Sequence, residues 1–225
     1  MVLKKIAEIQ NGYTEKFGIP RQSGLAPSVI SRIVFEEEYR VKEAFRDIEG
    51  YSHLWLIWDF SEAHREEWSP TVRPPRLGGN KRTGVFATRS PYRPNPIGLS
   101  CVKLEKVQLD TPLGPVLLVS GADLMNGTPI YDIKPYLPYA DSVPDAVGGF
   151  TGTVAKRTVS VEIPQNIEKD IPKDVLSAVK DILSEDPRPA YQNDPDRVYK
   201  MIFDGYEFAF SVKDEVLSVS EVKKL

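Results

Sequence analysis

Apolar residues in the first two-thirds of the chain recur at the short spacings that are typical of β-strands. HLWLIWDF (53–60) is a continuous apolar and aromatic run, and LSCVKLEKVQL (99–109) alternates between apolar and polar residues. Both patterns predict strands, the first of them central in its sheet. Further strands are predicted at 2–10, 28–35, 83–88, 115–121 and 129–134, and a short helix at 38–45. Many strands without long helices between them predict a mainly β protein with a small antiparallel barrel, closed or nearly closed, and argue against a doubly wound sheet.

The composition changes beyond Gly148-Gly149, and the rest of the chain is predicted to form a small α+β unit. A helix is expected to begin at Pro172, because proline is favoured in the first helical turn. The apolar face of this helix consists of Val175, Leu176, Val179, Ile182 and Leu183. YKMIF and YEFAFSV flank Asp204-Gly205, a two-residue turn that is typical of a β-hairpin. We therefore predict a barrel domain at 1–150 and a C-terminal α+β domain at 151–225.

Composition places the chain among soluble globular proteins. It is 41% hydrophobic and 27% charged, and no apolar run approaches the roughly 20 residues of a membrane helix. The first residues lack the pattern of a secretory signal, so a cytoplasmic location is expected. The single Cys101 allows no internal disulfide, and its place on an alternating strand predicts a small buried side chain.

A strong local imbalance underlies the net charge of −3. No acidic residue occurs between Glu67 and Glu105, and a charge of +7 in that window leaves −10 for the rest of the chain. The basic residues of the window are Arg73, Arg76, Lys81, Arg82, Arg89, Arg93 and Lys103. Such a stretch is often only a solvated face, but PPRLGG and SPYRPNPIG within it are loop sequences and favour an anion-binding rim.

Several kinds of active site find no support in the sequence. Metal catalysis needs a cluster of ligands, and the chain offers only His53, His64 and one cysteine besides its carboxylates, so no dedicated metal site is expected. Neither histidine accompanies a recognisable serine or cysteine nucleophile. The chain also lacks a GK[ST] phosphate loop and a GxGxxG motif. An adenosine-containing cofactor would have to be held outside a Rossmann-type site.

Three loop-like segments are rich in special residues: KFGIPRQSGL (16–25), GVFATRSPYRPNPIGLS (84–100) and DLMNGTPIYDIKPYLPYAD (123–141). Arg93 and Asn95 each precede a proline, which favours extended backbone and a preordered loop. The alternative is that these prolines only terminate strands.

Asp132 and Lys134 lie two residues apart within the third segment. In an extended chain such residues share a face, so they can form an ion pair. Whether that pair is functional or an ordinary surface contact stays open at this point.

These segments, together with YSHLWLIWDF, PTVRPPRLGGN, NGTPIYDIKPYLPY and the C-terminal EDPRPAY, resemble the TsaA-like family, also called YaeB-like or TrmO-type, in the order of that family. Asn126 departs from the acidic residue expected before Gly-Thr-Pro, but it suits the same turn. The resemblance implies a non-Rossmann barrel that uses S-adenosylmethionine to methylate the exocyclic amine of threonylcarbamoyl-adenosine beside the tRNA anticodon. It also implies a homodimer with the pocket close to the subunit interface.

The resemblance further implies which residues form the site. Cofactor contacts are expected at Gln22, Ser23, Gly24, Ser61, Glu62, Arg89, Leu99, Ser120, Gly121, Ala122 and Asp123. Contacts with tRNA are expected at Arg73, Arg76, Arg82, Tyr92, Arg93 and Asn95. The acceptor amine must lose a proton as the new bond forms, and the catalytic candidates for assisting this are Asp132, Lys134 and Tyr136.

Two other functions remain compatible with the sequence. The basic window and exposed tyrosines would suffice for an RNA-binding module without a cofactor. A methyltransferase that acts on a small molecule or a protein would keep the cofactor site but would not need the arginines.

Overall fold

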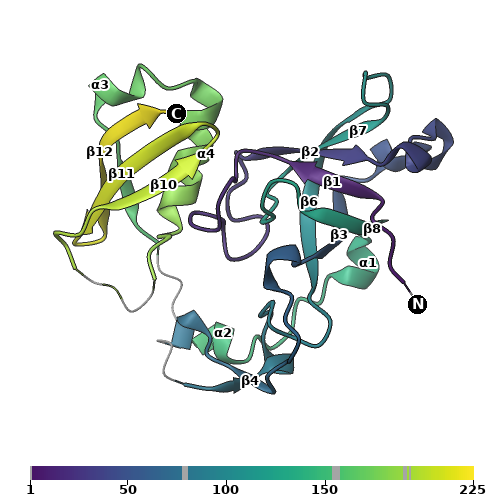
Figure 1. Ribbon diagram of the computed structural model, residues 1–225, viewed down its shortest axis with the longest axis horizontal. Helices are drawn as coiled ribbons and strands as arrows, with labels where there is room; N and C mark the ends of the chain where they lie inside the picture. The colour runs from purple at the N-terminus through teal and green to yellow at the C-terminus, as the bar shows by residue number, and fades with distance from the viewer. Residues whose placement is uncertain (1, 78–80, 154–157, 190–191, 193) are drawn as a thin grey trace.

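The computed structural model describes residues 2–77, 81–153, 158–189, 192 and 194–225. Six strands close into an antiparallel barrel in the order β1-β2-β7-β6-β3-β8 (Figure 1). Their bounds are β1 (Ala7–Gln10), β2 (Ile30–Phe35), β3 (His53–Asp59), β6 (Ile97–Gln108), β7 (Val116–Ser120) and β8 (Pro129–Pro135). The barrel confirms the predicted fold class.

Strand β3 is central, as predicted, because it pairs with β6 on one side and β8 on the other. Only one of its faces is buried, however. Leu54, Leu56 and Trp58 point into the barrel core, and the residues between them stay half-exposed. The aromatic run therefore supplies two different surfaces, one for packing and one on the outside of the barrel.

Two of the predicted elements were wrong in kind. The expected helix at 38–45 is a pair of 3-10 helices, η1 (Glu37–Tyr39) and η2 (Lys42–Phe45). The expected strand at 83–88 is only β5 (Thr83–Gly84), which pairs with β4 (Thr71–Val72) and continues into the 3-10 helix η6 (Val85–Ala87). Further 3-10 helices are η3 (Ile48–Gly50), η4 (Ser61–Ala63) and η5 (Pro75–Leu77).

A four-stranded sheet in the order β10-β11-β12-β9 forms the second part of the protein, with helices α3 and α4 beside it (Figure 1). We call this part the C-terminal unit. Its elements are β9 (Ser160–Glu162), α3 (Gln165–Glu168), α4 (Lys173–Ser184), β10 (Tyr199–Phe203), β11 (Tyr206–Lys213) and β12 (Val216–Lys224). The short helices α1 (Pro138–Asp141) and α2 (Phe150–Thr153) precede it.

Local chemistry explains the C-terminal elements that the sequence predicted. Asp204 and Gly205 have φ of +48° and +77°, which is the backbone that a tight two-residue hairpin turn requires. Pro172 caps α4, whose buried face is formed by Val175, Ala178, Val179, Ile182 and Leu183. Strand β12, which the sequence analysis did not identify, completes the sheet.

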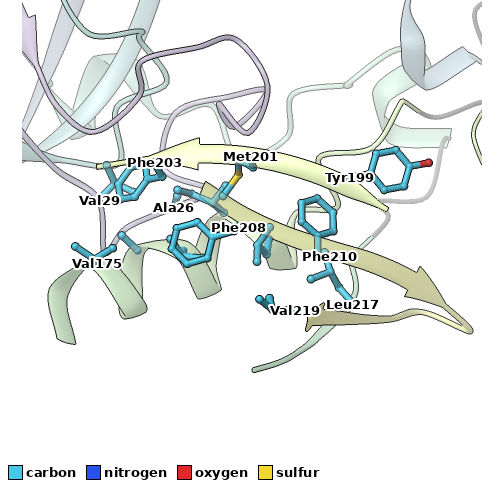
Figure 2. Close-up of a cluster of buried hydrophobic side chains, with 14 of the residues drawn as sticks. Ala26, Val29, Val175, Tyr199, Met201, Phe203, Phe208, Phe210, Leu217 and Val219 are labelled. Atoms are coloured by element: carbon cyan, nitrogen blue, oxygen red, sulfur yellow. The ribbon is translucent and has the colours of Figure 1, made fainter. Parts of the chain in front are cut away.

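Each sheet has its own hydrophobic core, but the second core contains residues from the first part of the chain. Tyr13, Ala26 and Val29, from the connection between β1 and β2, are buried among the side chains of α4, β10 and β11. Figure 2 shows Ala26 and Val29 in this cluster. The division at 150/151 stays a prediction, because the connection between β1 and β2 packs in the second core. Within the described ranges, no helix combines the length and apolar character needed to cross a membrane.

Candidate functional site

Two loops meet at one end of the barrel. The Gly24 N–H donates to the Gly121 carbonyl at 2.7 Å, which joins the β1–β2 connection to the segment after β7. Both glycines have positive φ, +81° and +74°. A Cβ on Gly121 would lie 3.0 Å from the Gly24 Cα, so this approach of two backbones requires glycine at 121.

Arg89 brings the second proline-rich segment to the same place. Its Nη1 donates to Gln22 Oε1 at 2.5 Å, across 67 positions of the chain. The guanidinium and the Ser23 backbone both act on the Asp123 carboxyl and favour its ionised form. Residues from all three segments singled out in the sequence therefore converge here.

Asp123 is held by a chain of hydrogen bonds from inside the barrel. Trp58 Nε1 donates to Ser100 Oγ at 2.9 Å, and Ser100 Oγ donates to Asp123 Oδ1 at 2.5 Å. Burial raises the pKa of Asp123 above its usual value, although the hydrogen bond from Ser100 and the charge of Arg89 oppose this shift. When it is ionised, the Asp123 carboxylate is thus poorly solvated.

Sequence reasoning missed Trp58, Ser100 and Gly98 in this arrangement. Gly98 faces the Trp58 ring so closely that an added Cβ would lie 2.1 Å from it. Gly98 and Ser100 fall within the singled-out 84–100 segment, which was the available signal. Strand β6 pairs with β3 so that Gly98 lies opposite Trp58. This pairing explains why glycine is needed at position 98, and only the tertiary structure shows it.

The other expected cofactor residues are more widely placed. Ser61 and Glu62 lie in η4, just after β3, and the Glu62 carbonyl accepts a hydrogen bond from Lys16. Ala122 is buried in the barrel core, and the Ser120 hydroxyl donates to Glu105 at 2.7 Å. Leu99 lies on the outer face of β6, 54% exposed. The structure therefore joins Gln22, Ser23, Gly24, Arg89, Gly121 and Asp123, whereas Leu99 and the Ser120 hydroxyl point elsewhere.

The catalytic candidates share the outer face of the barrel with Leu99. Asp132 and Lys134 form the expected ion pair at 2.9 Å, and the Asp132 carboxylate raises the pKa of Lys134. The Tyr136 ring lies 5.8 Å from that of Trp55. Ile57 of β3 pairs with Leu99 on one side and with Asp132 on the other. Asp132, a catalytic candidate, and Leu99, a cofactor candidate, are thus neighbours of the same strand residue.

A second titratable group at the end of β3 was not singled out by sequence. Asp59 Oδ1 lies 2.7 Å from His64 Nε2, with the Asp59 side chain only 12% exposed. Burial, together with the charge of Asp59, raises the pKa of Tyr131. His64, whose side chain is 57% exposed, thus has a carboxylate partner.

The predicted tRNA residues cluster around β4, β5 and the loop before β6. Arg73 and Asn95 are exposed, and Arg82 Nε donates to Thr71 Oγ1 at 2.7 Å. Arg93 is half-buried, and its Nη1 donates to the Thr88 carbonyl at 3.2 Å, so it braces its own loop. The side chain of Arg76 lies outside the part of the chain that the structure describes.

Tyr92 has an arginine partner that the basic window did not include. The Arg65 guanidinium lies 3.8 Å from the centre of the exposed Tyr92 ring. Two further exposed aromatic rings, those of Trp68 before β4 and Phe86 after β5, have their centres 6.2 Å apart. Cationic and aromatic side chains interleaved in this way suit single-stranded nucleic acid.

A groove of about 640 Å³ lies between the barrel and the C-terminal unit and is lined in part by Glu8, Arg32, Asp174 and Asp204. None of its lining residues belongs to the predicted site. Among the described residues, no group of three or more histidine, cysteine and acidic side chains is arranged to hold a metal ion.

The fold and this site define a class of protein: a closed antiparallel barrel, without a Rossmann fold, in which glycine backbone, an arginine and a buried carboxylate meet at one end. The chain belongs to the TrmO family. The model of the tRNA-methyltransferase O N-terminal domain matches residues 8–142, and that of the TrmO C-terminal domain matches residues 156–225.

Individual relatives agree with this family. A tRNA (adenine(37)-N6)-methyltransferase of Escherichia coli K12 is 41% identical over 84% of this chain and 83% of its own length. The enzyme of the same name from Eikenella corrodens is 45% identical, over 77% and 97%. A putative S-adenosylmethionine-dependent methyltransferase of Pseudomonas aeruginosa PAO1 is 40% identical, over 86% and 85%. The crystal structure of TrmO from Pseudomonas aeruginosa superposes with a TM-score of 0.78 at 31% identity, covering 99% of this chain and 98% of that one.

Proposed function

We propose that this protein transfers a methyl group from S-adenosylmethionine to the N6 amine of adenosine 37 in tRNA, where that amine carries a threonylcarbamoyl group. The names of the relatives support the reaction on adenine 37. The observation that carries the proposal is the convergence of Gln22, Arg89 and Asp123 at one end of a barrel that has no Rossmann-type site.

The residues at this end of the barrel fit the proposed cofactor. Arg89 is an exposed cation that can pair with the carboxylate of a free amino acid through parallel hydrogen bonds. Asp123 is a poorly solvated carboxylate, which gains from ribose hydroxyl groups or an ammonium group. Gly24 and Gly121 allow a ligand to approach the backbone closely.

When bound, S-adenosylmethionine would supply a methyl group on a positively charged sulfur, which leaves as a neutral thioether when the acceptor nitrogen bonds to the methyl carbon. The task of the protein is therefore alignment, together with removal of the proton from the amine. We assign the proton to Asp132. Lys134, whose pKa is raised by its hydrogen bond to Asp132, stays protonated and cannot accept it. Tyr136, whose ring packs against Trp55, offers a ring for the substrate base.

We further propose a homodimer that acts in the cytoplasm. Ile97 and Leu99 are exposed apolar residues on the outer face of β6, next to half-exposed Trp55 and Ile57 of β3. A contiguous apolar surface of this kind is typical of an interface, and it would bring Leu99 to the subunit boundary. The family resemblance supports the cytoplasmic location.

Calorimetry with S-adenosylmethionine tests the cofactor assignment. We expect the wild-type chain to bind in the micromolar range and Arg89→Ala to bind at least about tenfold more weakly, since a charged hydrogen bond is lost. Arg46→Ala is the matched control, because Arg46 is also exposed but lies outside the site. No binding to the wild-type chain would leave an RNA-binding module as the better description.

Mass spectrometry of tRNA nucleosides tests the reaction. Cells that lack the protein should lose one methyl group on threonylcarbamoyl-adenosine, and complementation should restore it. Asp132→Asn should lower kcat by about 100-fold or more, in the range of general-base effects, with little change in KM. If activity persists unchanged when Arg73 and Arg82 are both removed, the substrate is a small molecule or a protein.

A further inference from the structure

The connection between β1 and β2, residues 11–29, belongs to two parts of the protein at once. It begins and ends in the barrel, yet Tyr13, Ala26 and Val29 are almost fully buried in the core of the C-terminal unit. Figure 2 shows Ala26 and Val29 near Val175 of α4 and Phe203 of β10. We call this connection the cofactor loop, because it carries Gln22, Ser23 and Gly24.

Hydrogen bonds attach the cofactor loop to the C-terminal unit along its length. Near its start, the Asp204 N–H donates to the Gly12 carbonyl at 3.0 Å. The Ile202 N–H donates to Glu15 Oε1 at 2.9 Å. Near its end, the Ser28 N–H donates to Asp181 Oδ2 of α4 at 2.8 Å.

A further anchor involves EDPRPAY, the C-terminal segment that the family resemblance included but to which it gave no role. Arg188 and Asp186 form a buried bidentate pair, with N–O distances of 2.7 and 2.9 Å and both side chains 3% exposed. This pair fixes the backbone so that the Arg188 carbonyl accepts a hydrogen bond from Arg21 Nη2 at 3.0 Å. Arg21 directly precedes Gln22.

The residues that face the candidate cofactor site are therefore held from both sides. Arg21 and Ser28 are tied to the C-terminal unit, and Ser23 and Gly24, between them, are tied to Asp123 and Gly121 of the barrel. A loop that becomes ordered only when the ligand binds loses backbone entropy at that step. A loop that is already ordered lets a ligand bind without that cost.

We propose that the C-terminal unit is a positioning element for the methyl donor: through Asp181 and Arg188 it holds the cofactor loop in its binding conformation and so sets the affinity for S-adenosylmethionine. This inference rests on the proposed function. Asp181, Arg188 and Arg21 act through the loop and do not touch the reacting atoms.

Replacement of Asp181 tests the anchor at the end of the loop. Asp181→Ala removes the acceptor for the Ser28 N–H, whereas Asp181→Asn keeps a side-chain oxygen for it. We expect calorimetry without tRNA to give about three- to tenfold weaker binding of S-adenosylmethionine to Asp181→Ala, as for loss of one hydrogen bond, and wild-type binding to Asp181→Asn. Lys180→Ala is the matched control on the same helix, since Lys180 pairs with Glu168 and not with the loop.

Two further readouts separate positioning from general destabilisation. The KM for S-adenosylmethionine should rise in Asp181→Ala, while kcat at saturating cofactor stays within about twofold. Hydrogen exchange of the Gly24 amide in the free protein should become faster, because this amide donates a hydrogen bond to the Gly121 carbonyl in the anchored loop. Arg21→Ala, at an exposed residue, should reproduce these effects, and Arg21→Lys should restore part of the affinity.

The outcomes distinguish this inference from the proposed function. If the wild-type chain binds S-adenosylmethionine and folded Asp181→Ala and Arg21→Ala bind it equally well with unchanged amide exchange, the positioning role is wrong and the function stands. If the wild-type chain does not bind S-adenosylmethionine, the proposed function and this inference are both wrong.

Discussion

Replacement of Gly121 by alanine gives a direct test of the contact on which the site depends. Gly121 has φ of +74°, and an added Cβ would lie 3.0 Å from the Gly24 Cα and 3.2 Å from its nitrogen. Gly127 offers a matched control, since it has φ of +79° but no atom within 4 Å of an added Cβ. The two substitutions thus share the backbone strain and differ in the crowding.

The expected magnitudes follow from this comparison. Alanine at left-handed φ costs about 1–2 kcal/mol, which both variants lose. Crowding against a backbone that cannot move aside adds about 1–3 kcal/mol for Gly121→Ala alone. For a chain of this length about 2–4 °C corresponds to each kcal/mol, so Gly121→Ala should melt roughly 2–12 °C below Gly127→Ala.

Thermal unfolding followed by circular dichroism measures the stability difference, and calorimetry measures cofactor binding. Gly121→Ala should bind S-adenosylmethionine at least about tenfold more weakly than Gly127→Ala, because Gly24 and its neighbours must shift. Equal melting temperatures and equal affinities for the two variants would refute the reasoning that the backbone contact between Gly24 and Gly121 shapes the site.

Three further predictions concern charge. Asp123→Asn should be at least as stable as the wild type at neutral pH but should bind the cofactor more weakly. Because the pKa of Asp123 is raised in the folded state, the wild type loses stability as the pH rises from the ordinary value of 3.8 through the raised pKa. The difference in melting temperature between Asp123→Asn and the wild type should therefore shrink as the pH falls toward 4. Arg188→Met should lower the free energy of unfolding by about 3–5 kcal/mol in a denaturant titration, since it removes the bidentate cationic partner of the buried Asp186 carboxylate. Affinity for tRNA should fall as the salt concentration rises. Removal of Arg73 alone, or of Arg82 alone, should reduce the slope of log affinity against log salt concentration by about 1.

Each of these predictions has a control and an opposing outcome. Asp123→Asn would contradict the burial argument if its stability advantage grew as the pH fell. Lys200→Met is the control for the buried pair. Lys200 is 61% exposed in its ion pair with Glu207, so this substitution should destabilise the protein far less than Arg188→Met. An unchanged salt slope after loss of both arginines would remove them from the tRNA interface.

Most strands could be predicted from the sequence, because a strand leaves a local record in its pattern of apolar residues. The alternation in 99–109 reappears in β6, and the turn at Asp204-Gly205 closes a hairpin as expected. The elements that failed, 38–45 and 83–88, are short 3-10 segments. These have too few residues to establish a period, so pattern alone could not tell them from a helix or a strand.

The candidate site was only partly visible in the sequence. The glycines and arginine of the proline-rich segments marked it, since such residues stand out against what folding alone requires. Trp58 and Ser100, which hold Asp123, gave no such mark because each fits the pattern of its own strand. The ion pair of Asp132 and Lys134 was predictable because it is local.

The sequence by itself determined the six strands of the barrel, the hairpin and helix of the C-terminal unit, and the family to which the segments point. Only the tertiary structure decided that Gln22 meets Arg89 and that Ala26 is buried beside α4. The physical reason is range. Propensity and periodicity act over a few residues, whereas the partners of a loop that joins two cores are chosen by how those cores pack.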